Sequence, residues 1–182
     1  LSAQAMHGGD ERQEDFLLRS DSDDELRRKT LDALARVPAA VGVNNHMGSA
    51  LTTDARAMRV VLETLKEENK LFMDSRTHHE TVAVDVARSV GIAHAQRQVF
   101  LDHAPDPAAL AAALRDAIEQ AKAAPTVAIG HPSRALAAVL ETGLEEAYAE
   151  GVAVFPLSEH IARQAQERST DNPASGAGSS TP

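Results

Sequence analysis

The sequence predicts an α/β protein in which parallel strands alternate with helices. Helically spaced apolar residues and short apolar runs follow one another from about residue 21 to residue 155. The short runs are almost wholly apolar, which is typical of parallel strands that helices cover on both faces. The 182 residues suffice for one domain with a sizeable core, which Ala, Val and Leu must build because aromatic residues make up only 3%.

The first two helix and strand pairs are assigned from their apolar residues and their end signals. Acidic residues in a first turn and a proline stop predict a helix over 21–37, and "AAVGV" (39–43) predicts the first strand. Thr53 or Asp54 can cap the second helix, and "LFMD" (71–74) is the next strand.

Two more pairs follow with the same signals. Valines spaced by four over 82–90 mark a third helix closed by Gly91, before the strand "QVFLD" (98–102). Asp106 caps a fourth helix that leads into the strand "TVAIG" (126–130).

The last predicted pair is a helix capped by Ser133 and the strand "VAVF" (152–155). We therefore place the α/β domain at 21–166, after an irregular N-terminal remnant at 1–20. Residues 167–182 are rich in Ser, Thr, Gly, Pro and Ala, and this composition predicts a disordered tail.

Composition excludes several classes of function. The formal net charge is -9, and Lys and Arg form no basic stripe, so we expect no nucleic-acid partner. The chain has no cysteine, which excludes disulfides and thiolate metal sites. No apolar stretch is long enough for a membrane span, and the N-terminus lacks the pattern of a signal peptide.

The polar residues directly after the predicted strands are candidates for a functional site, because ligands of parallel α/β sheets bind at the carboxyl ends of the strands. They are Asn44, Asn45, His46, Asp74, Ser75, Arg76, Thr77, Asp102, His103, His131 and Ser158. Together they resemble a hydrolytic pocket. His46 and His131 could ligate a metal through neutral imidazoles, and Asp74 or Asp102 could act as a base. Arg76 could hold a developing oxyanion.

The same residues also have structural interpretations. His46 could cap backbone groups in a tight turn, and Asp74 could pair with Arg76 to tie two loops together. His131 could belong only to the start of the following helix, and Asp102 could serve as a cap.

Four motifs carry a resemblance to a known family: "VPAAVGVNNHMGSALTTD", "LFMDSRT", "VFLDH" and "AIGHP", in this order. They resemble the divergent polysaccharide deacetylase family, bacterial carbohydrate esterases with a NodB-like distorted (β/α) barrel. The resemblance runs from about Leu1 to Ser158. It implies hydrolysis of acetyl groups on a glycan, in the periplasm or outside the cell, with a divalent metal such as zinc held by one aspartate and two histidines.

The resemblance also implies roles for residues of this chain. In the family, the metal activates a water, an aspartate takes its proton, and a histidine near the last strands protonates the leaving group. The site residues implied here are His46 as a metal ligand, Asp74 and His131 as catalytic residues, and Asn45, Arg76 and Asp102 as substrate-binding residues.

The sequence departs from the family pattern at its N-terminal end. Family members begin with a strand that ends in two adjacent aspartates, and nothing here precedes Leu1 to supply it. Asp23 and Asp24 lie in a different context, and Ala3 stands where a histidine is common. We therefore expect this polypeptide, as an incomplete domain, to be inactive, and to self-associate through an uncovered sheet edge.

Two other functions remain open at this stage. A noncatalytic carbohydrate-binding or scaffold protein could be built on the same fold. Another α/β hydrolase, such as a phosphatase, would need a cluster of phosphate donors, whereas the strand ends offer only Arg76.

Overall fold

The computed structural model describes residues 2–3 and 16–170, and every strand pair in these ranges is parallel. The central sheet has the order β2-β4-β5, formed by Gly42–Asn44, Leu71–Asp74 and His94–Gln96. Two short pairs accompany it, β1 (Ser2–Ala3) with β3 (His46–Met47), and β6 (Val99–Phe100) with β7 (Ala128–Ile129). The predicted α/β class with parallel strands is confirmed.

The five predicted helices lie close to their predicted positions because local end signals determine where they begin, whereas the sequence analysis missed the helix α6 (Leu157–Thr170). A capping box joins Ser22 to Glu25, and the side chains of Asp54, Asp106 and Ser133 each accept a backbone N–H at the start of a helix. The helices are α1 (Asp23–Arg36), the short 3-10 helix η2 (Leu51–Thr53), α2 (Ala55–Glu67), α3 (Ala83–Val90), α4 (Pro107–Ala123), α5 (Arg134–Ala149) and α6 (Leu157–Thr170).

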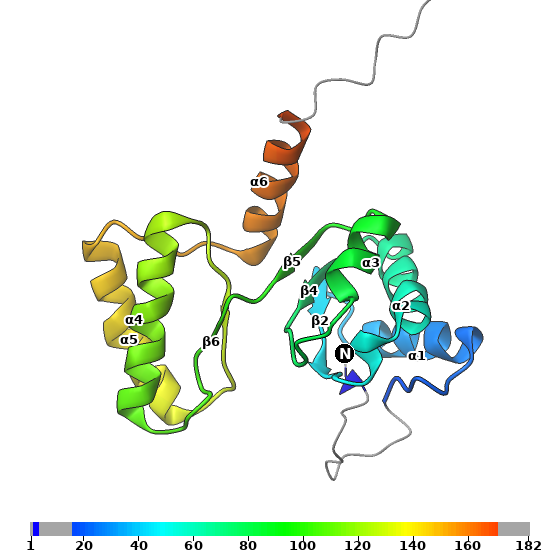
Figure 1. The fold of residues 1–182 in the computed structure, drawn as a ribbon, viewed down its shortest axis with the longest axis horizontal. Helices are drawn as coiled ribbons and strands as arrows, with labels where there is room; N and C mark the ends of the chain where they lie inside the picture. The colour runs from blue at the N-terminus through cyan, green and yellow to red at the C-terminus, as the bar shows by residue number, and fades with distance from the viewer. Residues whose placement is uncertain (1, 4–15, 171–182) are drawn as a thin grey trace, which may run out of the picture.

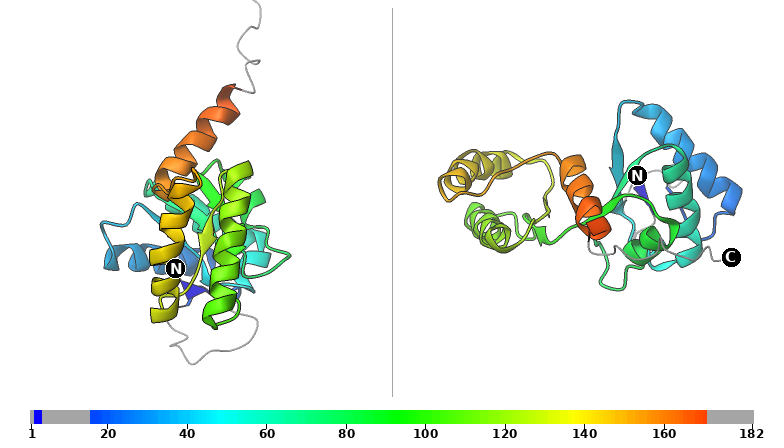
Figure 2. Two further views of the ribbon diagram at one scale, coloured as in Figure 1. Left: turned by 90° about the vertical axis from the view of Figure 1, so that its left-hand side faces the viewer. Right: turned by 90° about the horizontal axis from the view of Figure 1, so that it is seen from above.

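The elements gather in two groups, with α6 between them (Figures 1 and 2). One group holds the central sheet with α1, α2 and α3, and its core includes Leu26, Leu62 and Phe72. The other holds α4, α5, β6 and β7, around Leu110 and Leu136 among others. A smaller cluster joins Met73, Ala95 and Ile161, so α6 covers the face of the sheet opposite to α2 and α3. Within the described ranges, the core is thus divided into three clusters.

The structure corrects two strand assignments. The predicted strand at 152–155 is wrong, because Val152 instead packs beside the α4–α5 cluster and Val154 is 55% exposed. The sequence analysis also missed β5. Its residues, "HAQ", do not form an apolar run, but burial of His94 is possible because its Nδ1 bonds the carbonyl of Ile92 at 2.8 Å.

The predicted boundaries at the two ends differ from the observed elements. In the range 1–20, Ser2–Ala3 forms β1, and Phe16 and Leu17 are buried, so these parts are not irregular remnants. Helix α6 continues to Thr170, past residue 167, where the predicted tail begins. Residues 4–15 and 171–182 lie outside the described ranges. Within those ranges, no helix is both long and apolar enough to cross a bilayer.

Gly42 allows β2 to approach β4 closely, and this predicts a strong effect of substitution. A Cβ atom at this position would lie 2.8 Å from Leu71 Cβ and 2.9 Å from the Leu71 carbonyl oxygen. Because a backbone oxygen cannot move aside cheaply, Gly42→Ala should lower the free energy of unfolding by about 2 kcal/mol. Gly151→Ala is the control, since a Cβ there meets nothing within 4 Å and only its φ of 82° is unfavourable. Equal melting temperatures for Gly42→Ala and wild type would contradict the expected collision.

Candidate functional site

A cleft of about 560 Å³ opens at the carboxyl ends of the parallel strands. The loops after β2, β4 and β7, together with the segment around β6, line it. Among the lining residues are Asn45, His46, Arg76, Phe100 and His131. Four of the residues with predicted roles, Asn45, His46, Arg76 and His131, therefore line one cleft although they follow different strands.

His46 and His131 face each other across this cleft. Their ring centroids are 6.0 Å apart, and the rings meet edge to face. The chain turns sharply after His46, because Met47 and Gly48 both have left-handed backbone angles, with φ of 60° and 50°. This turn leaves the His46 side chain exposed to the cleft.

Asp102 holds His131 at two points. Its Oδ2 accepts the backbone N–H of His131 at 2.9 Å and contacts the ring Nδ1 at 3.0 Å. Burial by itself would raise the pKa of Asp102, but these hydrogen bonds outweigh it and hold the pKa below its usual range. The ionised carboxylate can only accept, so Nδ1 carries the proton and Nε2 is the ring nitrogen left to act on a ligand.

The other oxygen of Asp102 has no hydrogen-bond partner in the described part of the chain. Oδ1 is buried and accepts no hydrogen bond among the described residues. A Cβ at Gly130 would come within 3.4 Å of it and within 2.7 Å of Leu136 Cδ2, so only glycine fits there without displacing a neighbour. An unsatisfied buried acceptor is uncommon in folded proteins.

Asp74 lies beneath the cleft rather than in it. The residue is fully buried, and its carboxylate accepts the backbone N–H of Arg76 at 2.8 Å and the hydroxyl of Thr81 at 3.1 Å. Burial raises the pKa of this carboxyl above its usual value. Asp74 therefore supports the loop that carries Arg76, through a backbone N–H and not through the guanidinium of the predicted ion pair.

Asn45 also binds this loop. Its Oδ1 accepts the N–H of Ser75 at 2.8 Å, and its Nδ2 lies 3.5 Å from Thr77 Oγ1. Asn44 adds a contact from Nδ2 to Ser75 Oγ at 3.0 Å. The predicted substrate-binding residue Asn45 lines the cleft, while its carboxamide connects the loops after β2 and β4.

Sequence reasoning missed Arg97 and Phe100, which both line the cleft. Arg97 donates to the carbonyls of Ser75 at 2.6 Å and Arg76 at 2.7 Å, and its guanidinium carbon lies 5.3 Å from the Phe100 ring centroid. Arg97 thereby holds Arg76, whose φ of 49° is unusual for a residue other than glycine. Phe100 could have been noticed in the sequence, because aromatic residues make up only 3% of the chain and this one lies near the end of a predicted strand.

Comparison with known proteins decides the family. A family model for divergent polysaccharide deacetylases matches residues 3–161. The chain belongs to this family. Two relatives are the uncharacterized protein YibQ of Escherichia coli, 39% identical over 121 residues, and an uncharacterized protein of Haemophilus influenzae, 40% identical over 106 residues. These alignments cover 66% and 58% of the chain but only 38% of each relative.

A solved structure supports the same fold. The crystal structure of the uncharacterized protein ATU2773 from Agrobacterium tumefaciens matches with a TM-score of 0.81, at 18% sequence identity. The match covers 87% of this chain and 65% of that protein, and it is consistent with a NodB-like fold. The matched region thus spans 38% of the length of each of the two relatives and 65% of the solved structure.

The divergent polysaccharide deacetylase family implies a divalent metal, and the described residues do not form a complete site for one. Within residues 2–3 and 16–170, no three His, Cys, Asp or Glu side chains are grouped closely enough to hold a metal ion. Catalytic zinc sites typically have three protein ligands. His46 and His131 supply at most two, and Asp102 already binds the second of them.

Proposed function

We propose that this chain belongs to an enzyme that hydrolyses acetyl groups on a glycan, and that the cleft binds the acetylated sugar. The observation that carries the proposal is the Asp102–His131 pair, which faces His46 across a cleft at the carboxyl ends of the strands. An imidazole with an oriented, protonated Nδ1 and an accessible Nε2 is suited to proton transfer at a bound substrate.

Hydrolysis of an acetamide adds water to the carbonyl carbon, with loss of a proton from that water to solvent, and then breaks the C–N bond and releases acetate. The leaving nitrogen must gain a proton, and a protonated His131 would donate it from Nε2, while Asp102 stabilises the positive ring. For an acetyl ester, the proton would go to the leaving oxygen. In both cases, the imidazole is protonated again from solvent after acetate leaves.

Other lining residues would bind and orient the sugar. Arg76 offers an exposed cation for the developing oxyanion. Phe100 offers apolar ring surface on the same wall, with its ring centroid 5.6 Å from that of His131. The loop contacts of Asn45 and Arg97 keep this wall in place.

The proposal includes a divalent metal such as zinc, with His46 as one of its ligands. Because the described residues supply too few ligands, the others would have to come from elsewhere in the protein. The proposed place of action is the periplasm or the cell exterior, where acetylated envelope glycans occur. We also propose self-association through β2, which is an edge strand of the central sheet within the described residues.

His46→Ala tests the proposal in a protein that includes the sequence flanking this chain. We expect acetate release from an acetylated glycan to fall at least about a hundredfold, because the variant loses a metal ligand or a substrate contact that the reaction needs. The melting temperature should change little, because the His46 side chain is exposed. His79→Ala, an exposed histidine outside the cleft lining, is the control. A large fall in melting temperature with full activity would instead support a structural role.

A noncatalytic glycan-binding or scaffold protein is the second candidate. The incomplete set of metal ligands among the described residues favours it. Calorimetry would separate the two functions: glycan binding without zinc binding or acetate release, in the protein with its flanking sequence, would favour the noncatalytic one.

A further inference from the structure

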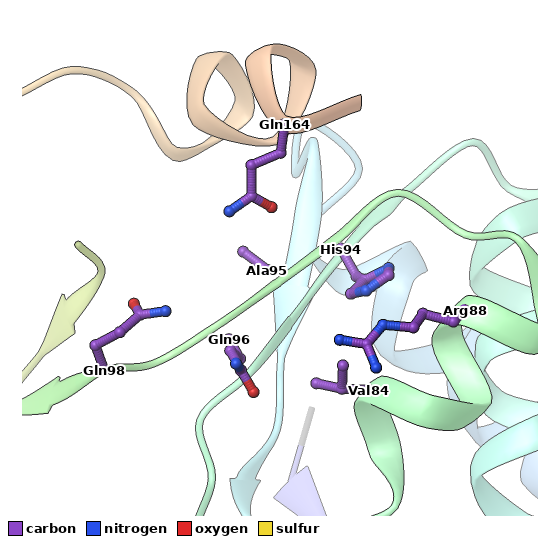
Figure 3. A pocket seen from close by; sticks show the side chains of 7 residues that line it. All are labelled: Val84, Arg88, His94, Ala95, Gln96, Gln98 and Gln164. Atoms are coloured by element: carbon purple, nitrogen blue, oxygen red, sulfur yellow. The ribbon is translucent and has the colours of Figure 1, made fainter. Parts of the chain in front are cut away.

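A second hollow, of about 320 Å³, lies at the outer edge of β5 (Figure 3), and none of its lining residues lines the cleft. Arg88 reaches it from α3 and Gln164 from α6, while His94, Gln96 and Gln98 come from β5 and the segment after it. Three carboxamides, a guanidinium and an imidazole thus line one small space. Nothing in the proposed reaction uses these side chains.

The backbone of β5 adds polar groups at this edge. The Ala93 carbonyl accepts the N–H of Phe72, and the N–H of Arg97 donates to the Asp74 carbonyl, so the two residues that flank β5 direct these backbone groups toward β4. In a parallel pair, the intervening residues direct their N–H and C=O groups to the other side. His94 and Gln96 therefore direct these groups away from β4, and β5 is the last strand of the described sheet.

Existing hydrogen bonds orient several of the side chains. Gln98 Oε1 accepts the Val127 N–H at 2.8 Å, which leaves its Nε2 as a donor. His94 Nδ1 lies 2.8 Å from the Ile92 carbonyl, so Nδ1 carries the proton and Nε2 is an acceptor in the neutral ring. The Gln164 carboxamide points from α6 toward β5 (Figure 3), and its Nε2 lies 3.0 Å from His160 Nε2 on the same helix. Donors and acceptors therefore lie around the same hollow.

We propose that this hollow is a second sugar-binding site, which takes one sugar ring with an acetamido group. Carboxamides and a guanidinium suit sugar hydroxyls, and the N–H and C=O groups of the β5 edge suit the N–H and C=O of an acetamide. The choice of an acetylated sugar rests on the proposed function. The volume is near the low end of ligand pockets, about 300–1,000 Å³, and so suits a single ring.

The short length of β5 argues against an extended peptide as the ligand. The strand covers only His94–Gln96, so its outer edge offers the backbone groups of two residues. Peptides that add a strand to a sheet pair with a longer edge than this. Two outward residues suffice for one amide group but not for a strand.

The second site and the cleft lie on either side of the segment 96–98. Arg97 lines the cleft, while its neighbours Gln96 and Gln98 line the hollow. The site can therefore bind one sugar of a glycan without occupying the position beside His131.

NMR titration of the 182-residue chain with N-acetylglucosamine tests the proposal, with glucose as the comparison sugar. We expect the backbone amides of His94 and Gln96 to shift with N-acetylglucosamine and much less with glucose. Gln96→Leu and Gln164→Leu, on separate elements, should each weaken this binding about tenfold, the effect of losing one or two hydrogen bonds. Gln120→Leu, on the exposed face of α4, should leave it unchanged.

Each further outcome decides between the hypotheses. His46→Ala should leave the His94 and Gln96 shifts intact, because it changes only the cleft. Shifts confined to the cleft would overturn the second site and leave the proposed function standing. Shifts at the second site without acetate release by the protein with its flanking sequence would support the second site and overturn the proposed hydrolysis. Larger shifts at β5 with trialanine than with the sugar would show strand addition by a peptide and overturn the proposal.

Discussion

His131→Gln is expected to lower kcat for acetate release by at least about a hundredfold, in the protein that includes the flanking sequence. A positioned general acid typically contributes about 10²–10⁴-fold, and glutamine cannot supply the proton that the leaving group needs. The His131 side chain is 60% exposed, so the melting temperature should stay within a few degrees of wild type. Acetate release and thermal unfolding measured on the same preparations check both expectations.

Asp102→Asn provides the matched comparison for His131→Gln. Asparagine can keep one hydrogen bond to His131 but cannot stabilise a positive ring, so we expect a smaller loss of kcat than for His131→Gln. A second expectation is that KM changes less than kcat, because Asp102 acts through His131 and does not itself line the cleft. Full activity of His131→Gln would refute the assignment of the acid.

Asp74→Ala should lower the free energy of unfolding by about 2–4 kcal/mol. The substitution leaves a cavity at a fully buried position and removes the acceptor of the Arg76 N–H and the Thr81 hydroxyl. Chemical denaturation measures the loss. Thr77→Ala, in the same loop, is the control and should cost less, because its contact to Asn45 is long at 3.5 Å.

Asp74→Asn should change how stability depends on pH. Burial raises the pKa of Asp74 in the folded protein above its usual value of 3.8, so the folded protein keeps this proton to a higher pH than the unfolded chain does. The stability that comes from this group is therefore complete below about pH 3.8 and is lost as the pH rises through the folded pKa. Asparagine does not ionise, so wild type should lose stability relative to Asp74→Asn over this rise. A difference that stays constant with pH would show that Asp74 does not titrate in this way.

The predicted helices agree with the structure where strong local signals exist. Ser133, Asp106 and Asp54 cap helices because their side chains bond backbone groups two or three residues away, a contact that the local sequence determines. The strands were less predictable. "VAVF" is apolar but pairs with no strand among the described residues, whereas "HAQ" is polar and forms β5, because strand formation depends on partners that are distant in the sequence.

The roles of the site residues depended still more on distant contacts. Asp74 and Asp102 look alike in the sequence, since each is the acid at the end of an apolar run. The structure buries Asp74 beneath the loop of Arg76, whereas it places Asp102 against the ring and the backbone of His131. These differences arise from which loops meet, and no local pattern records them.

The order of motifs by itself determined the family, the parallel α/β architecture and the placement of His46 and His131 at strand ends. These features follow from residue type and chain order, which set helix ends, strand direction and the edge of the sheet where loops gather. Only the tertiary structure decided that the two imidazoles lie 6.0 Å apart, that Asp74 is buried, and that Arg97 holds the Arg76 loop. The reason is physical: distances between groups on different loops depend on the packing of several elements at once, and each element carries only its own part of that information.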